Sequence, residues 1–272
     1  MTTLPIPFPL VTVPAEAGIL SSYNRKGGTE GARADMQPLA GLSMNRIAAD
    51  VLSAFLKLAE AVAAAGGDWR ITDLFRDAAV QQAARQKYLN WVNAGKPAAG
   101  SATFNSKTMK AAFVAEVGKS FHMGGRALDY NIATLKFPNI APDKQLDKLW
   151  EIAKPLGFSP VIEAPIEGKS ESWHLDMRGE LEGVYKRTDY GTAALVSSLI
   201  CGNGASYQTY ERLVQALLLR GGYAIGALDG LIGTKTAAAI CEALHMEPNT
   251  VGHAVTEKRD FIILELAKLP AK

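Results

Sequence analysis

Apolar residues recur at three- and four-residue intervals between residues 43 and 65, a spacing that places side chains on one face of a helix. Ser43 is a suitable N-cap for this helix, and Gly66-Gly67 ends it. The positions predicted to face a core are Ile47, Val51, Phe55, Leu58 and Val62. The first strongly patterned segment is therefore an amphipathic helix, preceded by a stretch rich in proline, glycine and serine.

Helical and strand patterns are interspersed in the following hundred residues. Segments with a helical pattern are 77–95, 106–118 and 143–158. In the last of these, Leu146, Leu149, Trp150 and Ala153 share one face. Strands are predicted at 68–75 (with Trp69, Ile71 and Leu74 toward a core), after the turn at 120–125, and from Trp173 onward. This mixture predicts an α+β fold.

The pattern also divides the chain. Residues 1–42 are interpreted as an N-terminal arm with loops, packed on the domain formed by residues 43–190. Residues 191–205, rich in Gly, Ser and Ala, are interpreted as a linker. Residues 206–272 form a second domain, with short helices predicted at 206–220, 234–244 and 256–267.

Composition and charge exclude several classes of protein. Hydrophobic residues make up 48% and charged residues 21%, which is typical of a globular protein. The net charge is only +2, so we expect no binding to nucleic acid. No apolar run approaches the roughly 18 residues of a membrane span, and no basic segment opens a secretory signal. We therefore expect a monomer that is made in the cytoplasm and has no membrane partner.

Two cysteines, Cys201 and Cys241, are too few for a disulfide framework, and their spacing fits no metal motif. We interpret them as small core or surface residues in a reducing compartment.

Two of the four histidines have carboxylates nearby. Asp129 follows His122 by seven residues, and Glu171 precedes His174 by three. A catalytic zinc takes three such protein ligands and leaves a fourth position for water. His122, Asp129 and His174 supply that set, and Glu171 remains as a base for the water that the metal activates. From spacing alone, such pairs are more often core or surface groups that have ordinary partners.

Local geometry is compatible with a metal site. Gly124-Gly125 permits a sharp turn after His122, and the following strand can then bring Asp129 back beside it. On the last strand His174 and Asp176 share a face, so Asp176 could bind the far nitrogen of a ligand imidazole. Trp173 then points the other way, into the core, and Glu171 lies in the loop before the strand.

These two segments resemble a known family. Ser120, His122, Gly125, Ala127 and Asp129 match the pattern Ser-x-His-x-x-Gly-x-Ala-x-Asp, and residues 171–174 match Glu-x-x-His with Trp before His. Together they are similar to the zinc peptidases of the D-alanyl-D-alanine carboxypeptidase family, which includes the L-alanyl-D-glutamate endopeptidases of phage lysins. The resemblance covers roughly residues 40–180 and implies a small antiparallel sheet with flanking helices.

The resemblance also implies roles for single residues. His122, Asp129 and His174 would be ligands of one zinc ion, and Glu171 the general base. Arg76 occupies the place of the arginine in the family's Tyr-Arg-Ser segment, although Phe75 and Asp77 replace its usual neighbours. Arg76 would bind a substrate carboxylate or the oxyanion, or else form a surface salt bridge with Asp73 or Asp77. Ser120 would hydrogen-bond substrate or cap the turn.

The last seventy residues resemble the three-helix peptidoglycan-binding domain of cell-wall hydrolases. Val214-Gln215, Gly222-Tyr223 and the run from Asp229 to Thr236 keep the register of its LQ…LGY…DGxxGxxT pattern. Most of these positions can be explained by structure alone, since Asp229-Gly230 and Gly233 suit turns before a helix. Asp229 has no spaced carboxylate partners for calcium, and His245 and His253 are expected at the surface.

The resemblances together imply a modular zinc metallopeptidase whose partner is peptidoglycan. Its activity would be the cleavage of stem peptides in the bacterial cell wall, as a phage endolysin that accumulates in the host cytoplasm and acts at the wall. One alternative is a bacterial D-Ala-D-Ala carboxypeptidase of wall remodelling, and another is a non-catalytic wall-binding protein on a peptidase-like scaffold. On this view, removing residues 203–272 leaves hydrolysis of soluble fragments nearly intact.

Overall fold

The computed structural model describes residues 4–26, 29–95, 102–104, 107–109, 114–160, 171–248, 251, 255 and 257–272. The fold is α+β, as the sequence predicts. Its main sheet has the strand order β3-β2-β5-β8-β10-β9. These strands are β2 (Leu20–Lys26), β3 (Thr29–Pro38), β5 (Ile71–Asp73), β8 (Ala127–Tyr130), β9 (Phe158–Ser159) and β10 (His174–Met177). The expectation of an antiparallel sheet is wrong at one pairing, because β2 runs parallel to β5.

The N-terminal arm belongs to the sheet. Residues 20–26 and 29–38 pair as β2 and β3 of the main sheet, and β1 (Leu10–Thr12) pairs with β4 (Arg46–Ala48) in a separate two-stranded sheet. The sequence predicts an extended arm with loops for residues 1–42, and it does not predict that the arm contributes these strands. Strand β2 is not predicted from the sequence because two of its buried positions, Ser21 and Ser22, are polar. Ser21 is fully buried and donates its hydroxyl to the carbonyl oxygen of Ile71 at 2.8 Å, so a strand without apolar alternation is still satisfied.

Helix α1 (Ala49–Ala64) begins later than predicted. Ile47 lies in β4, and Ala48, not Ser43, is the N-cap, because pairing with β1 keeps residues 46–48 extended. The predicted core positions Val51, Phe55, Leu58 and Val62 are buried. Helices α2 (Ala78–Asn93) and α3 (Gln145–Ala153) confirm the predictions for 77–95 and 143–158.

The short helix predicted at 106–118 is not found in the described part of that segment. Lys107–Met109 forms strand β7, which pairs with β6 (Ala102–Phe104), and residues 114–118 contain no helix. Residues 110–113 lie outside the described chain. Apolar spacing over so short a segment does not distinguish a helix from a hairpin.

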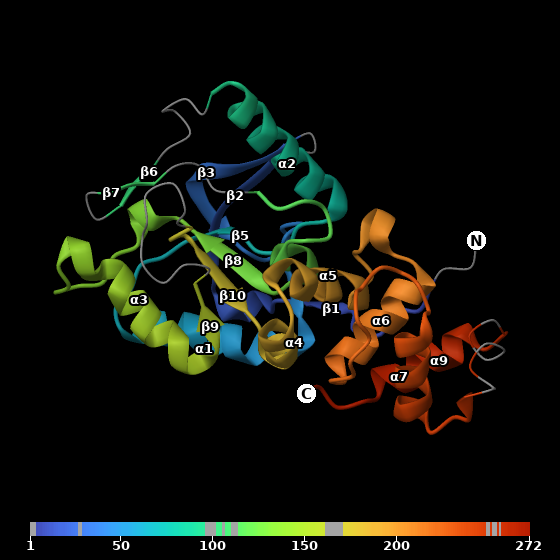
Figure 1. The fold of residues 1–272 in the computed structure, drawn as a ribbon. Coiled ribbons are helices and arrows are strands. Elements are labelled where there is room, and N and C mark those ends of the chain that lie inside the picture. Colours follow the sequence, from blue (N-terminus) through green and yellow to red (C-terminus); the bar gives the residue numbers. More distant parts are fainter. Residues whose placement is uncertain are drawn as a thin grey trace.

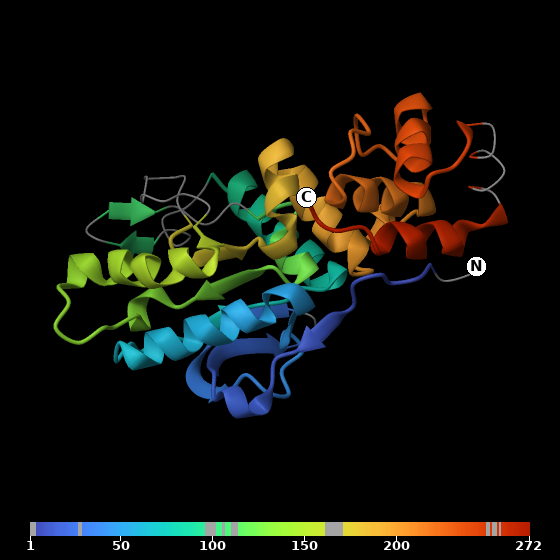
Figure 2. The same cartoon turned by 90° about the horizontal axis from the view of Figure 1, so that it is seen from below.

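A helical lobe lies beside the sheet (Figures 1 and 2). It contains α6 (Tyr210–Arg220), α7 (Thr234–Leu244) and α9 (Arg259–Ala267), near the three helices predicted for residues 206–272. Helix α4 (Glu182–Arg187) is followed by α5 (Tyr190–Ile200), which lies between the sheet and this lobe. Residues 191–205, predicted as a linker, thus consist largely of a buried helix, because the run Ala193–Ile200 packs into a core.

Two apolar cores organise the molecule. One lies between the sheet and α1 and α3, and includes Phe55, Leu58 and Leu149. The other runs without interruption from Phe121 and Ala127 through α5 into α6, α7 and α9. The helical lobe therefore shares its core with the domain that carries the histidines. None of the helices in the described part of the chain has the length and apolar character that a membrane span requires.

Candidate metal centre

A sharp turn before β8 delivers His122 and Asp129 to one place. Phe121–Gly124 is a short 3-10 helix that ends at Gly125, whose φ of +64° favours glycine. Gly124 is needed for a different reason, since a Cβ there would lie 1.6 Å from Oγ of Ser197 in α5. The predicted turn and strand are confirmed. Gly125 is required by the backbone conformation of the turn, and Gly124 is required by its close packing against Ser197.

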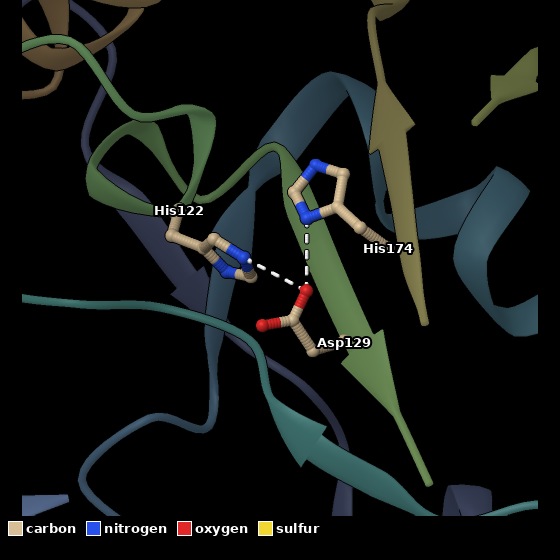
Figure 3. A group of neighbouring side chains, drawn as sticks. All are labelled: His122, Asp129 and His174. Atoms are coloured by element: carbon tan, nitrogen blue, oxygen red, sulfur yellow. Dashed lines mark hydrogen bonds and ion pairs between the residues drawn. The ribbon is translucent and has the colours of Figure 1, made fainter. Parts of the chain in front are cut away.

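Strand β10 brings the second histidine opposite the aspartate. β10 pairs antiparallel with β8, and His174 is directly opposite Asp129 in this register. His122, Asp129 and His174 are all buried, and one ligand atom from each lies within 4.8 Å of the others. Figure 3 shows both imidazole rings pointing toward the carboxylate of Asp129.

The distances identify which atoms face the centre. Oδ1 of Asp129 lies 3.2 Å from Nε2 of His122 and 2.8 Å from Nδ1 of His174. On the far side of each ring, Nδ1 of His122 lies 2.7 Å from the carbonyl oxygen of Leu74, and Nε2 of His174 lies 2.8 Å from Oδ1 of Asp176. Each ring thus has an acceptor on its outer nitrogen and presents its other nitrogen to Asp129.

This donor set fits a metal ion. Tetrahedral ligands at about 2.0 Å from a metal such as zinc are about 3.3 Å apart, which the 3.2 Å separation between Asp129 Oδ1 and Nε2 of His122 matches, while the 2.8 Å separation from Nδ1 of His174 would have to widen. Ligand histidines in proteins donate their outer N–H to a carboxylate or a backbone carbonyl, as Asp176 and Leu74 allow here. The contact between His174 and Asp176 is the one that the sequence predicts. The His122–Asp129–His174 group can therefore hold a metal ion.

The electrostatics of the buried group favour charged forms. Burial alone would raise the pKa of Asp129, but His122 and His174 outweigh it and hold the pKa well below its usual value. Burial alone would lower the pKa of His174, but the Asp176 and Asp129 carboxylates raise that pKa well above its usual value. Without a metal, the centre therefore keeps an ionised Asp129 carboxylate beside a protonated His174 imidazole, and binding of a cation releases the proton of His174.

Glu171 lies in the loop that enters β10, as predicted, and lines the same cavity as the three buried residues. The cavity has a volume of about 380 Å³. Burial, only partly offset by the charge on His174, raises the pKa of Glu171 to about 7. A carboxyl group with this pKa can both take up and release a proton near neutral pH.

Arg76 is part of the centre. Its Nε donates to Asp73, one of the two partners that the salt-bridge alternative named, and its Nη2 donates to Oδ2 of Asp129 at 2.9 Å. The contact with Asp129 appears in neither prediction, because it joins residues that are 53 positions apart. Arg76 thus fixes one oxygen of Asp129 while the other oxygen faces the histidines.

Ser120 is buried and lines the cavity, and its side chain makes no capping hydrogen bond to the 3-10 helix that follows. The capping alternative is therefore wrong, while contact with substrate stays a prediction. Trp173 corrects another expectation. It packs partly against the apolar core between the sheet and helices α1 and α3. Because it immediately precedes the first residue of β10, it also lines the cavity.

Sequence reasoning missed Tyr190, which lines the cavity from the first turn of α5. Its hydroxyl lies 3.3 Å from Oδ1 of Asp176. Asn203 was also missed, although its Nδ2 donates to the carbonyl oxygens of Arg76 and Met123 at 2.9 and 2.8 Å. Neither residue belongs to a motif, and only the position of α5 brings them to the site.

In the helical lobe, the buried side-chain amide of Gln215 explains why Gln215, Asp229 and Gly230 of the sequence pattern occur together. Nε2 of Gln215 donates to Oδ1 of Asp229 at 3.0 Å, and its Oε1 accepts from the backbone N–H of Gly230 at 2.8 Å. Asp229 also accepts from the N–H of Leu231, so its carboxylate stabilises a turn, as predicted. His245 is exposed, as expected, whereas His253 lies outside the described residues.

No protein-family model matches this chain, and no curated protein matches it.

Proposed function

We propose that this protein is a zinc-dependent peptidase that cleaves stem peptides of bacterial peptidoglycan, and that it acts as a phage endolysin. The observation that carries the proposal is the buried His122–Asp129–His174 group with Glu171 in the same cavity. The resemblance of residues 40–180 to the D-alanyl-D-alanine carboxypeptidase family supplies the substrate class and the fold of the zinc peptidase domain.

In this proposal Nε2 of His122, Nδ1 of His174 and Oδ1 of Asp129 hold the zinc ion. When bound, zinc lowers the pKa of water and polarises the carbonyl group that is attacked. Glu171 accepts the proton of the attacking water on its carboxylate and gives it to the leaving amine. Its raised pKa of about 7 suits both transfers near neutral pH.

Two further residues orient the reactants. Arg76 places a guanidinium in the cavity wall, where its positive charge favours a substrate carboxylate or a developing oxyanion. Its ion pairs with Asp73 and Asp129 hold that group in one orientation. Ser120 offers a hydroxyl in the same cavity and would hydrogen-bond the peptide.

The helical lobe would bind the wall. Residues 203–272 contain seven basic and seven acidic side chains, so binding should depend on shape and hydrogen bonds more than on charge. Binding at a second site raises the local concentration of an insoluble substrate. We expect the full-length protein to sediment with purified sacculi at moderate salt, and loss of sedimentation under these conditions would contradict the role of the lobe.

Mass spectrometry of digested peptidoglycan tests the activity. An endopeptidase releases stem-peptide fragments whose masses identify the cleaved bond. Loss of terminal D-alanine alone would instead indicate a carboxypeptidase of wall remodelling. Absence of any product, with sedimentation retained, would indicate a non-catalytic wall-binding protein. Elemental analysis of the same preparation should find about one zinc ion per chain, and a chelator should abolish the release of fragments.

A further inference from the structure

Helix α5 contacts both segments that carry the proposed metal ligands. At its C-terminal end, Ser197 packs directly against Gly124, and Sγ of Cys201 lies 3.4 Å from the carbonyl oxygen of Met123. Asn203, just beyond the helix, donates to that same carbonyl oxygen. The turn that contains His122 is therefore packed against the end of α5.

At the other end of α5, Tyr190 reaches the second ligand segment. Its hydroxyl donates to Oδ1 of Asp176 at 3.3 Å, and the same oxygen lies 2.8 Å from Nε2 of His174. The ring of Tyr190 meets Phe121 edge-on, with 5.1 Å between centroids, and contacts Tyr185 in the same way at 6.1 Å. A continuous chain of contacts thus runs from α5 through Asp176 to His174.

The orientation of Asp176 depends on few partners. Its side chain is fully buried, and its Oδ2 has no hydrogen-bond partner among the described residues. The carboxylate is therefore held through Oδ1, by His174 and by Tyr190. Without the hydroxyl of Tyr190, Asp176 would keep only its contact with His174, so fewer contacts would fix the orientation of the carboxylate and of the imidazole.

We propose that Tyr190 is a positioning residue of the metal centre: its hydroxyl holds Asp176 in the orientation that keeps Nδ1 of His174 directed at Asp129. The inference rests on the proposed function, in which these residues bind zinc. Tyr190 belongs to α5, the helix that lies between the metal centre and the helical lobe. The packing of the lobe against α5 therefore affects the geometry of the metal centre.

Tyr190→Phe tests the inference, because it keeps the ring and removes only the hydroxyl. Tyr185→Phe is the matched control from the same aromatic cluster, since in the described chain its hydroxyl makes no hydrogen bond to Asp176. Zinc affinity is measured by competition with a chromophoric chelator. We expect Tyr190→Phe to bind zinc about 10- to 100-fold more weakly, and Tyr185→Phe to stay within about threefold of wild type.

Two more measurements separate positioning from folding. The metal-free Tyr190→Phe protein should still unfold in one cooperative transition, with a thermal midpoint only a few degrees below that of metal-free wild type, and its kcat should fall while KM stays unchanged. If Tyr190 acts through Asp176, adding Tyr190→Phe to Asp176→Ala should not weaken zinc binding further.

Unchanged zinc affinity in Tyr190→Phe, an equal loss in Tyr185→Phe, or additive losses in the double variant would each overturn the inference and leave the proposed function standing. A wild-type protein that binds no zinc would refute both.

Discussion

Nδ1 of His122 donates to the carbonyl oxygen of Leu74, 48 residues earlier in the chain, at 2.7 Å. Because a carbonyl oxygen can only accept, this bond requires a proton on Nδ1, and the other ring nitrogen, Nε2, faces Asp129. His174 uses its nitrogens in the opposite sense, with Nε2 toward Asp176 and Nδ1 toward Asp129. Two strands and a turn thus direct two different ring nitrogens at one carboxylate oxygen.

We predict that His122→Ala, Asp129→Ala and His174→Ala each abolish zinc retention and peptidase activity, because a site with three protein ligands cannot lose one. Zinc content by elemental analysis and release of muropeptides are the measurements. His245→Asn is the control, since this exposed histidine ends α7 in a left-handed conformation that asparagine tolerates. A variant that keeps stoichiometric zinc and full activity would remove its residue from the proposed ligand set.

Glu171→Gln should keep zinc and fold but lower kcat by about two to four orders of magnitude, because an amide cannot accept the proton. Glu116→Gln is the control, since Glu116 lines the same cavity but is exposed and paired with Lys119. We expect that variant to stay within about threefold of wild type. Loss of zinc from Glu171→Gln would make Glu171 a ligand, and near-normal turnover would transfer the role of base to another carboxylate, with Asp176 tested first.

The raised pKa of Glu171 also predicts a pH dependence of stability in the metal-free protein. Between its unfolded pKa of 4.5 and its folded pKa of about 7, the unfolded chain has already ionised Glu171 while the folded chain has not. The free energy of unfolding therefore falls as pH rises through this window, by on the order of 1–3 kcal/mol at about 1.4 kcal/mol per pKa unit. Urea unfolding at pH 4.5 and pH 8 measures it. Glu171→Gln should lack this decrease, and a parallel decrease in both proteins would contradict the assignment.

Deleting residues 203–272 should destabilise the whole protein, contrary to the separable module that the sequence predicts. The deletion exposes buried residues of α5 that pack against α6, such as Val196 and Leu199, and it removes Asn203 from the turn that carries His122. We expect loss of solubility and of zinc retention in the truncated chain. Leu217→Ala, a smaller change in the same core, should cost about 2–5 kcal/mol of stability. A soluble truncated protein with full zinc and activity on soluble fragments would restore the two-module division.

Cys201 should resist alkylation in the folded protein. Burial raises the pKa of its thiol to about 11, so only about one thiol in a thousand is ionised at pH 8. Iodoacetamide at pH 8, followed by peptide mass spectrometry, should label Cys241 well before Cys201, and both should react in denaturant. Rapid labelling of Cys201 in the folded state would show that the end of α5 opens readily.

Patterns that depend on neighbouring residues could be predicted from the sequence. The buried face of α1, helices α2 and α3 and the three helices of the lobe follow from apolar spacing, because the period of a helix is a local property. The turn at Gly125 and the strand that carries Asp129 could be predicted for the same reason. Strand β2 could not, since its buried Ser21 is satisfied by Ile71, a residue fifty positions away.

The sequence by itself thus determined most of the helices, the turn before β8 and the residue types of the candidate centre. Only the tertiary structure decided that Arg76 binds Asp129, that Tyr190 reaches Asp176, and that the segment after residue 190 is a buried helix. Each of these features depends on residues that are distant in the sequence, so no local sequence pattern predicts it. The run Ala193–Ile200 illustrates the reason: small and apolar residues favour neither a linker nor a helix until a second surface, here α6 and the turn at Gly124, covers them.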